Sequence, residues 1–253
     1  MEKVCDIYDF LNSLAPVTLK MDFDNVGLLV GDADAEVKSV LLALDITDAV
    51  IDEAVKLDAG LIVSHHPVIF EPMKSIVPTD HQGRKVISLI RNGISAICMH
   101  TNLDIAEGGV NDALASALGG RVTGFLEPCG RICELPREIE LNDFLFVCKE
   151  KLSCGGIRYH SAGRPVKKLA VLGGSGASSL ALAAKSGCDT FVTSDIKYNH
   201  FLEAAELGIN LIDADHFCTE NVIIPVLHDK LTARFPDIRF TISKVHTQTA
   251  KFY

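Results

Sequence analysis

Three short apolar runs in the sequence end in side chains that can bind divalent metal ions. The side chains at these ends are His65 and His66, His100 and Asp104, and His216 and Glu220. Imidazole nitrogens and carboxylate oxygens together are typical ligands of zinc, iron, manganese and nickel. One histidine at a strand end is usually an ordinary polar group. Three such ends of the same type favour a metal centre.

Apolar runs of strand length alternate with amphipathic stretches, which predicts an α/β fold with mostly parallel or mixed sheets. In the first half we expect strands at 40–44, 61–63 and 94–98 and helices at 48–57, 84–91 and 111–118. In the second half we expect strands at 169–172, 190–193 and 209–212 and helices at 178–186, 199–207 and 220–234. Thr219 is the expected N-cap of the last helix.

The second half repeats the plan of the first. The segment 54–65 is similar to the segment 183–194, and each is followed by a helix and another strand with a polar end. We therefore expect two related α/β domains, 1–124 and 125–253, with the Gly-, Pro- and Cys-rich stretch 119–136 as the joint. Two alternatives stay open: the similarity reflects common α/β patterning alone, and C-terminal elements return to the first domain.

The topology itself predicts where a ligand binds. In open parallel sheets the binding crevice lies beyond the carboxyl ends of the strands, where all three polar ends are expected. We therefore expect a site in the cleft between the two halves. Adjacent residues of a regular strand face opposite ways, but Pro67 ends the strand at once and frees His65 and His66 to turn together.

The number of ligands favours two ions over one. Three imidazoles and two carboxylates are one ligand too many for a tetrahedral structural ion. They are too few for two ions unless a carboxylate bridges and water fills the open positions, as in two-metal hydrolytic sites. If Thr219 is the N-cap, Glu220 lies in the first helical turn, whose partial positive charge would keep its carboxylate ionised.

Three further residues are candidates for a catalytic role. His100 could act as a general acid or base or support a ligand, although a buried hydrogen-bonded histidine is equally common. Asp195 could orient a water or a histidine, and a plain helix cap is the alternative. His200 could face the same crevice from a helix start. The remaining histidines, 81, 160, 228 and 246, are expected to be surface or locally bonded residues.

A glycine-rich turn, Gly173-Gly174-Ser175-Gly176, follows an expected strand and opens an expected helix. Such turns can present backbone N–H groups to a phosphate, so these four residues are candidates for cofactor or nucleotide binding. The turn matches neither the dinucleotide-binding pattern nor a Walker loop. A tight strand-to-helix turn without a ligand is therefore the competing interpretation.

Composition restricts the class of protein. The chain has 253 residues, 48% of them hydrophobic, and a net charge of −9 without a basic run, which argues against a nucleic-acid surface. The start lacks a signal-peptide pattern and no apolar stretch is long enough to span a membrane. Eight cysteines without a C-x-x-C pair favour reduced core thiols. We expect a cytoplasmic protein.

These residues, over essentially the whole chain, resemble the family of GTP cyclohydrolase I type 2 homologues, also called NGG-interacting-factor-like proteins. The motifs that carry the resemblance are the segment 24–32, Ser64-His65-His66-Pro67, His100-Thr101-Asn102-Leu103-Asp104, the glycine turn at 173–176, Thr193-Ser194-Asp195 and the pair His216 and Glu220. The sequence departs from the family pattern at Ser194 and at Asp215, where glycine is usual. At 253 residues it resembles the short form without an inserted middle domain.

The resemblance implies two α/β domains, a dinuclear metal site between them and a toroidal homohexamer. It implies that His66 and Asp104 bind one ion, that His65 and His216 bind the other, and that Glu220 bridges both. The two divalent ions could be zinc, iron, manganese or nickel.

The function expected on this basis is a metal-dependent hydrolase. A metal-bridging hydroxide would act on a purine or pterin-type nucleotide. The alternative is a non-catalytic metal-binding protein, such as a metallochaperone or regulatory scaffold. Neither nucleic acid nor membrane is an expected partner; the expected partners are other copies of the chain and a nucleotide-like small molecule.

Overall fold

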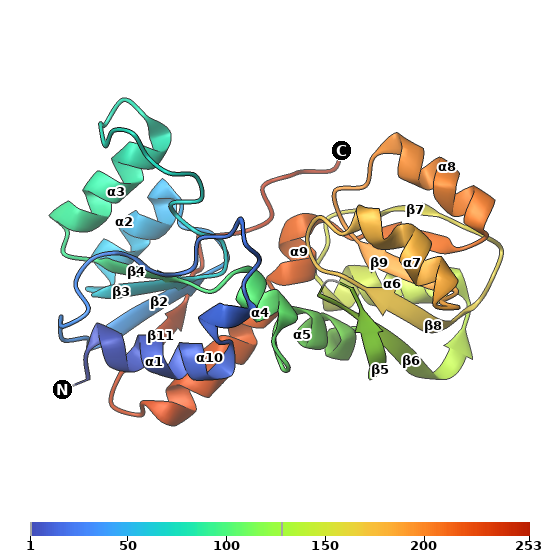
Figure 1. Ribbon diagram of the computed structural model, residues 1–253, viewed down its shortest axis with the longest axis horizontal. Helices are drawn as coiled ribbons and strands as arrows, with labels where there is room; N and C mark the ends of the chain where they lie inside the picture. Colours follow the sequence, from blue (N-terminus) through green and yellow to red (C-terminus); the bar gives the residue numbers. More distant parts are fainter. Residues whose placement is uncertain (1, 128) are drawn as a thin grey trace. The chain divides into compact units, whose positions relative to one another are not determined.

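The computed structural model describes residues 2–127 and 129–253 of the chain (Figure 1). The chain forms two compact units. The first unit comprises Met1–Glu107 and Ile224–Thr247, and the second comprises Gly108–Ile223 and Gln248–Tyr253. The predicted boundary between residues 124 and 125 falls inside a strand of the second unit, because residues from Gly108 onward already pack with the second sheet.

The first unit is built on a five-stranded sheet with the order β1-β4-β3-β2-β11. Its strands are β1 (Gly27–Val30), β2 (Ser39–Ala43), β3 (Leu61–Ser64), β4 (Ser95–Cys98) and β11 (Arg239–Ile242). Strands β2, β3, β4 and β11 run parallel, and β1 is antiparallel to β4. Every residue of β2, β3 and β4 is buried, which explains why these strands are almost uniformly apolar in the sequence.

Helices cover both faces of this sheet. They are α1 (Val4–Leu14), the 3-10 turn η1 (Val17–Leu19), α2 (Asp48–Lys56), α3 (His81–Arg91), α4 (Thr101–Ile105) and α10 (Ile223–Arg234). Figure 1 shows α2 and α3 over one face and α1 and α10 over the other. The core under α2 and α3 joins Leu41 and Ile62 of the sheet to Val50 and Leu89 of the helices. These two layers hold the carboxyl ends of β2, β3 and β4 in fixed positions.

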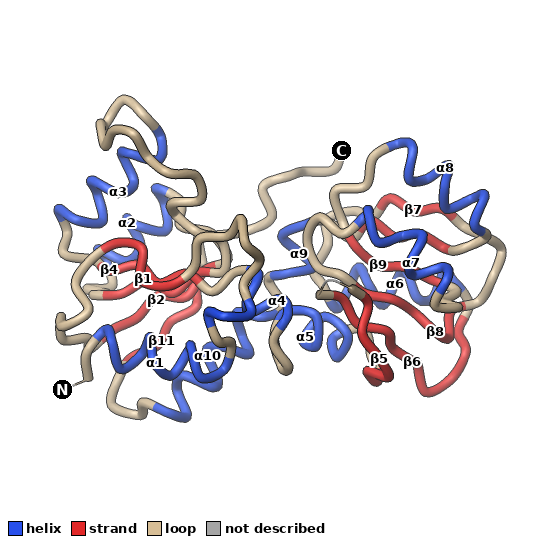
Figure 2. The backbone as a smooth tube through the Cα atoms, in the orientation of Figure 1, coloured by secondary structure: helices blue, strands red, loops and turns tan. Residues whose placement is uncertain are grey.

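The second unit contains a six-stranded sheet with the order β5-β6-β8-β9-β10-β7. Its strands are β5 (Arg121–Leu126), β6 (Gly130–Ile139), β7 (Arg158–His160), β8 (Val166–Val171), β9 (Thr190–Thr193) and β10 (Asn210–Asp213). Its helices are α5 (Val110–Ala117), α6 (Leu141–Lys151), the 3-10 turn η2 (Ala177–Ser179), α7 (Leu180–Lys185), α8 (Tyr198–Leu207) and α9 (His216–Glu220). Residues of α5, α6 and α9 share one apolar core with the sheet, and α7 and α8 lie on its other face (Figure 2).

The two sheets share a common arrangement, as the sequence repeat predicts. Each has three neighbouring parallel strands connected by two helices, β2-α2-β3-α3-β4 in the first unit and β8-α7-β9-α8-β10 in the second. In each sheet an antiparallel strand, β1 or β7, flanks the last of the three. The predicted mixed α/β fold, with two halves of the same plan, is therefore confirmed.

All six predicted strands are present, but the predicted helix from Glu220 to Arg234 is wrong. The chain instead forms α9 over His216–Glu220 and α10 over Ile223–Arg234. Asp215, not Thr219, is the N-cap of α9, and its side chain accepts the Cys218 N–H. Asp215 has a φ of +66°, an uncommon conformation for a residue other than glycine that apolar periodicity does not reveal.

None of the eight cysteines forms a disulfide in the described chain, as predicted, and seven of them are buried. Burial raises the pKa of the Cys133 thiol to about 12 and that of Cys188 to about 11, so these thiols stay protonated at neutral pH. Within the described residues, no helix has the length and apolar character that crossing a membrane requires.

A buried ion pair fixes α5 against the sheet of the second unit. The Arg131 guanidinium, which is 1% exposed, donates to both carboxylate oxygens of Asp112 at 3.0 and 2.9 Å and to the Cys129 carbonyl at 2.7 Å. On the same helix, Asn111 accepts the backbone N–H of Gly173 at 2.8 Å. The ion pair therefore helps to position the glycine turn described below.

We predict that Asp112→Ala lowers the free energy of unfolding by about 3–5 kcal/mol, because it removes the carboxylate partner of a buried charge. The matched control is Glu134→Ala in β6, the strand that also carries Arg131. Glu134 pairs with Arg121 at 3.4 Å on the surface, so its removal should cost at most about 1 kcal/mol. Urea denaturation of both variants measures the difference, and equal losses would contradict this role of the buried pair.

Candidate metal centre

The two adjacent histidines follow β3, where its pairing with β2 ends. The backbone N–H groups of His65 and His66 both donate to the Leu44 carbonyl, at 3.2 and 2.9 Å. Because β3 lies between β4 and β2, each of the two side chains forms a hydrogen bond with the segment that follows a different neighbouring strand. The Nδ1 of His65 donates to the Met99 carbonyl beyond β4, and that of His66 donates to Asp45 beyond β2, both at 2.8 Å.

His100 is held in the same way from the end of β4. Its Nδ1 lies 2.7 Å from Oδ1 of Asp24, whose other oxygen accepts the backbone N–H of Thr101 at 2.9 Å. Burial opposes ionisation of Asp24, but the hydrogen bonds from His100 and Thr101 outweigh it and hold the pKa of this carboxyl well below its usual range. Asp24 is therefore an ionised carboxylate that accepts a hydrogen bond from the Nδ1–H group of His100.

The pKa of Asp45 is lowered for a related reason. Burial again opposes ionisation, and hydrogen bonds from His246 and then His66 outweigh it. His246 Nε2 donates to the second Asp45 oxygen at 2.8 Å. Asp45 thus joins a strand-end histidine to a histidine near the C-terminus.

Three imidazoles of the first unit converge. The ring centroids of His65, His66 and His100 lie 5.0–5.5 Å apart, and one nitrogen from each lies within 4.8 Å of the others. The predicted ligand Asp104 approaches the same place, with its Oδ1 3.6 Å from His65 Nε2. Within the first unit, the structure thus brings three predicted site histidines and one carboxylate together.

The distance between His65 and Asp104 fits a shared cation. Because His65 Nδ1 donates to a carbonyl, Nε2 of the neutral ring carries a lone pair, and it faces a carboxylate oxygen. A separation of 3.6 Å is too long for a hydrogen bond. It suits two ligand atoms that each lie about 2.0–2.2 Å from one zinc-like ion.

The second unit carries a smaller set of ligands. His216 Nδ1 lies 2.7 Å from Asp195 Oδ2, and His216 Nε2 lies 3.0 Å from Glu220 Oε2, one helical turn along α9. Asp195 follows β9 and has a φ of +54°. Because its carboxylate contacts Nδ1 of His216, it orients a histidine, which is one of its two predicted roles. Glu220 ends α9 rather than beginning a helix, so the predicted ionising effect of a helix N-terminus on Glu220 is wrong.

The glycine turn packs against these ligands instead of presenting free N–H groups. The N–H of Gly173 donates to Asn111, that of Gly174 to Thr219 and that of Gly176 to Thr193. Three backbone donors of the predicted phosphate-binding turn 173–176 are therefore already used, which favours the competing interpretation of a tight turn. A Cβ at Gly174 would overlap Glu220 Oε1 and lie 3.1 Å from His216 Nε2.

Comparison with known proteins identifies the family. The sequence pattern of the family Duf34/NIF3 (NGG1p interacting factor 3) matches residues 2–250. This chain belongs to the NIF3 family. It is 36% identical to the "GTP cyclohydrolase 1 type 2 homolog" of Clostridium perfringens over 252 residues, which cover 96% of each chain.

Solved structures of similar proteins agree with this assignment. Staphylococcus aureus protein SA1388 superposes with a TM-score of 0.93 at 30% identity over 99% of each chain. A Bacillus cereus protein related to NIF3 superposes with a TM-score of 0.90 at 25% identity, covering 100% of this chain and 99% of the other. The predicted family and fold are thus confirmed.

One departure from the NIF3 pattern has a structural explanation. Asp215, where glycine is usual, has a positive φ, which glycine adopts at little cost. In this chain the aspartate at that position supplies the N-cap of α9. For Ser194 the structure shows a hydroxyl that donates to the Gly174 carbonyl, which ties the end of β9 to the glycine turn.

His200 lies apart from the candidate ligands. It is the third residue of α8, and its Nδ1 accepts the backbone N–H of Lys197 at 3.3 Å. In the described chain, His200 belongs to none of the groups that could hold a metal ion. His200 is therefore not a candidate metal ligand, and its catalytic role stays a prediction.

Sequence reasoning missed Asp45 and the role of His246, and used Asp24 only as part of the motif at 24–32. Asp45 follows a predicted strand that ends at Leu44, so the strand-end rule that selected the histidines could have found it. His246 contacts Asp45 across about 200 residues of chain, and no local pattern indicates that contact.

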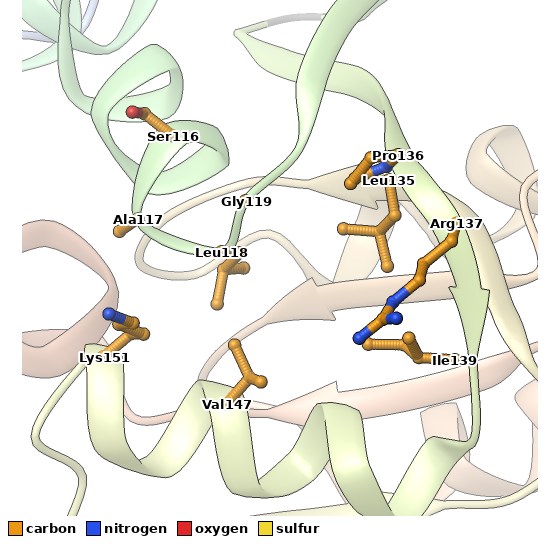
Figure 3. Close-up of a pocket in the computed structure, with 10 residues that line it drawn as sticks. All are labelled: Ser116, Ala117, Leu118, Gly119, Leu135, Pro136, Arg137, Ile139, Val147 and Lys151. Atoms are coloured by element: carbon orange, nitrogen blue, oxygen red, sulfur yellow. The ribbon is translucent and has the colours of Figure 1, made fainter.

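A separate cavity of about 400 Å³ lies in the second unit between α5, β6 and α6 (Figure 3). Leu118, Leu135 and Val147 line it, and Arg137 and Lys151 extend along its sides. None of the predicted site residues lines this cavity. It therefore carries no part of the candidate metal centre.

We predict that Gly174→Ala displaces Glu220 and weakens metal retention by the second unit. Gly208→Ala is a matched control, because both glycines have a φ of +65° and a Cβ at Gly208 meets nothing within 4 Å. Both variants should lose about 1–2 kcal/mol of stability from backbone strain. Metal content after desalting should fall only in Gly174→Ala; equal metal content in both variants would contradict the close packing against Glu220.

Proposed function

We propose that this protein is a dinuclear metal-dependent hydrolase, similar to GTP cyclohydrolase 1 type 2, that acts on a purine or pterin-type nucleotide. One observation carries the metal-binding part. Each of four imidazoles has its Nδ1 held by an acceptor in its own unit: His65 by Met99, His66 by Asp45, His100 by Asp24 and His216 by Asp195. This leaves Nε2 as the nitrogen that can bind a metal, an arrangement typical of metal-binding histidines.

The proposed metal ligands are the five residues selected from the sequence. They are His65, His66 and Asp104 of the first unit and His216 and Glu220 of the second. When bound, a pair of divalent ions supplies a nucleophilic water at neutral pH and offsets negative charge that develops in a reaction. The His65–Asp104 separation and the fixed ring orientations support this choice of ligands. The separation favours one ion for His65 and Asp104, whereas the resemblance implies a different ion for each. Sharing of ligands by the two halves stays a prediction.

His100 is the proposed proton carrier. Its Nδ1 is held by Asp24, so a proton enters or leaves at Nε2, and the Asp24 carboxylate stabilises the imidazolium that forms. One nitrogen of His100 also lies within 4.8 Å of a nitrogen of His65 and of His66. A role as a further ligand is therefore the alternative that the geometry supports for this residue.

One observation favours the second candidate function, a metallochaperone or regulatory scaffold with the same ligands. Three backbone N–H groups of the turn 173–176 are used internally, so the chain lacks the phosphate contacts expected of that turn. Turnover of metal-loaded protein with purine and pterin nucleotides separates the two candidates. Two bound metals without turnover above that of free metal would favour the binding protein.

The proposed centre predicts two metal equivalents per chain. We expect Glu220→Ala to lose both, because a bridging carboxylate serves two ions, and His65→Ala to lose mainly one. His81→Ala is the control, since this histidine is an exposed neighbour of Asp80. Inductively coupled plasma mass spectrometry of desalted samples gives the counts. A wild-type protein that saturates at one equivalent would exclude the dinuclear assignment.

A further prediction concerns Asp104→Asn. The change keeps the shape of a buried side chain and removes its charge, so kcat should fall by about 100-fold or more while KM changes little. Asp229→Asn, on an exposed helix position, is the control and should leave both constants unchanged. Steady-state kinetics on the nucleotide that turns over makes the comparison. A rise in KM at constant kcat would contradict a role for Asp104 in the chemical step.

A further inference from the structure

We propose that Phe23 and Phe70 form a binding surface for the planar aromatic ring of the substrate, beside the histidine cluster of the first unit. This inference rests on the proposed function and adds the residues that would recognise the ring. The rings of Phe23 and Phe70 meet edge to face, with centroids 6.3 Å apart and planes at 69°. The Phe70 ring in turn lies 6.1 Å from the His100 ring, at 85°.

Both rings are exposed to solvent. Phe23 is 65% exposed and Phe70 is 39% exposed, so solvent covers apolar surface directly next to the candidate ligands. Exposed apolar patches of this kind commonly mark binding sites. A ring that covered the pair would recover the free energy of that exposed apolar surface and add aromatic stacking.

The surface is held in place by polar contacts on either side of the rings. Asp24, next to Phe23, accepts hydrogen bonds from His100 and from Thr101. The Asn25 side chain donates to the Ile69 carbonyl, next to Phe70, at 2.6 Å, and so ties the two loops together. A surface fixed before binding loses little conformational entropy on contact with a ligand.

The chemistry of the surface favours a ring. Asp22 precedes Phe23 and Glu71 follows Phe70 as exposed carboxylates, and the Lys20 ammonium beside them is held by the Asp24 carbonyl at 2.8 Å. Phenyl faces stack on any flat heterocycle and read no particular hydrogen-bond pattern. The surface therefore suits a purine or pterin ring as a class, with the ring beside His100.

The test compares two probes on zinc-loaded protein by isothermal titration calorimetry. GTP carries ring and phosphates, and inorganic triphosphate carries the phosphates alone. We expect Phe23→Ala and Phe70→Ala to weaken GTP binding about 10-fold and to leave triphosphate binding unchanged. Phe146→Ala is the matched control, because Phe146 is 66% exposed on α6 of the second unit and should affect neither probe.

A tryptophan reporter gives a second measurement that does not depend on metal. The chain has no tryptophan, so Phe70→Trp introduces a single tryptophan, whose fluorescence is excited separately from that of the four tyrosines. Guanosine should quench it, and the same nucleoside should leave the fluorescence of Phe146→Trp unchanged. The metal content of every variant is measured on the same samples.

The other possible results overturn either the ring surface or the proposed function. Unchanged GTP affinity in both alanine variants overturns the ring surface, as does an equal loss of GTP and triphosphate. If the alanine variants bind GTP unchanged but have a lower molar mass than the wild type by light scattering, the patch is instead a contact with a second copy of the chain. If the wild-type protein retains no zinc after loading, the proposed function is overturned. The quenching of Phe70→Trp by guanosine then decides the ring surface independently.

Discussion

The hydrogen bond at Nδ1 of each strand-end histidine is the interaction on which the candidate site depends. A free imidazole rotates and can bind a metal through either nitrogen. Here Met99 and Asp45, which follow the strands at either side of β3, hold His65 and His66 from opposite directions. Neighbouring strands lie about 4.8 Å apart, so adjacent strand ends bring such partners within hydrogen-bond range. The order of strands therefore determines which nitrogen is available to a metal.

Both units place histidines and carboxylates at the ends of parallel strands, but the side chains at corresponding positions differ. In each half the last of three parallel strands leads into a short helix that carries a histidine and, four residues later, a carboxylate: His100 and Asp104, and His216 and Glu220. The end of the middle strand differs. It holds two histidines in the first unit, whereas in the second unit it holds Asp195, which orients His216. One half thus supplies most of the imidazoles and the other supplies a histidine with its own orienting carboxylate.

Much of this arrangement could be predicted from local sequence. Buried parallel strands are continuous apolar runs, so their ends mark where polar residues gather, and this rule located the histidines and Asp104. The rule could not find the start of α9, because the positive φ of its N-cap Asp215 leaves no trace in apolar periodicity. It also could not show that Asn111 and Thr219 occupy the N–H groups of the glycine turn, since Asn111 lies 62 residues from Gly173. Contacts between distant segments decided those points.

Anomalous diffraction from zinc-loaded crystals tests the central claim most directly. The fixed Nδ1 groups predict zinc at about 2.0–2.1 Å from Nε2 of His65, His66 and His216, with each Nδ1 still bonded to its present acceptor. Zinc bound through Nδ1 of any of these histidines would contradict this account. Zinc bound elsewhere, with the three histidines unchanged, would contradict it as well.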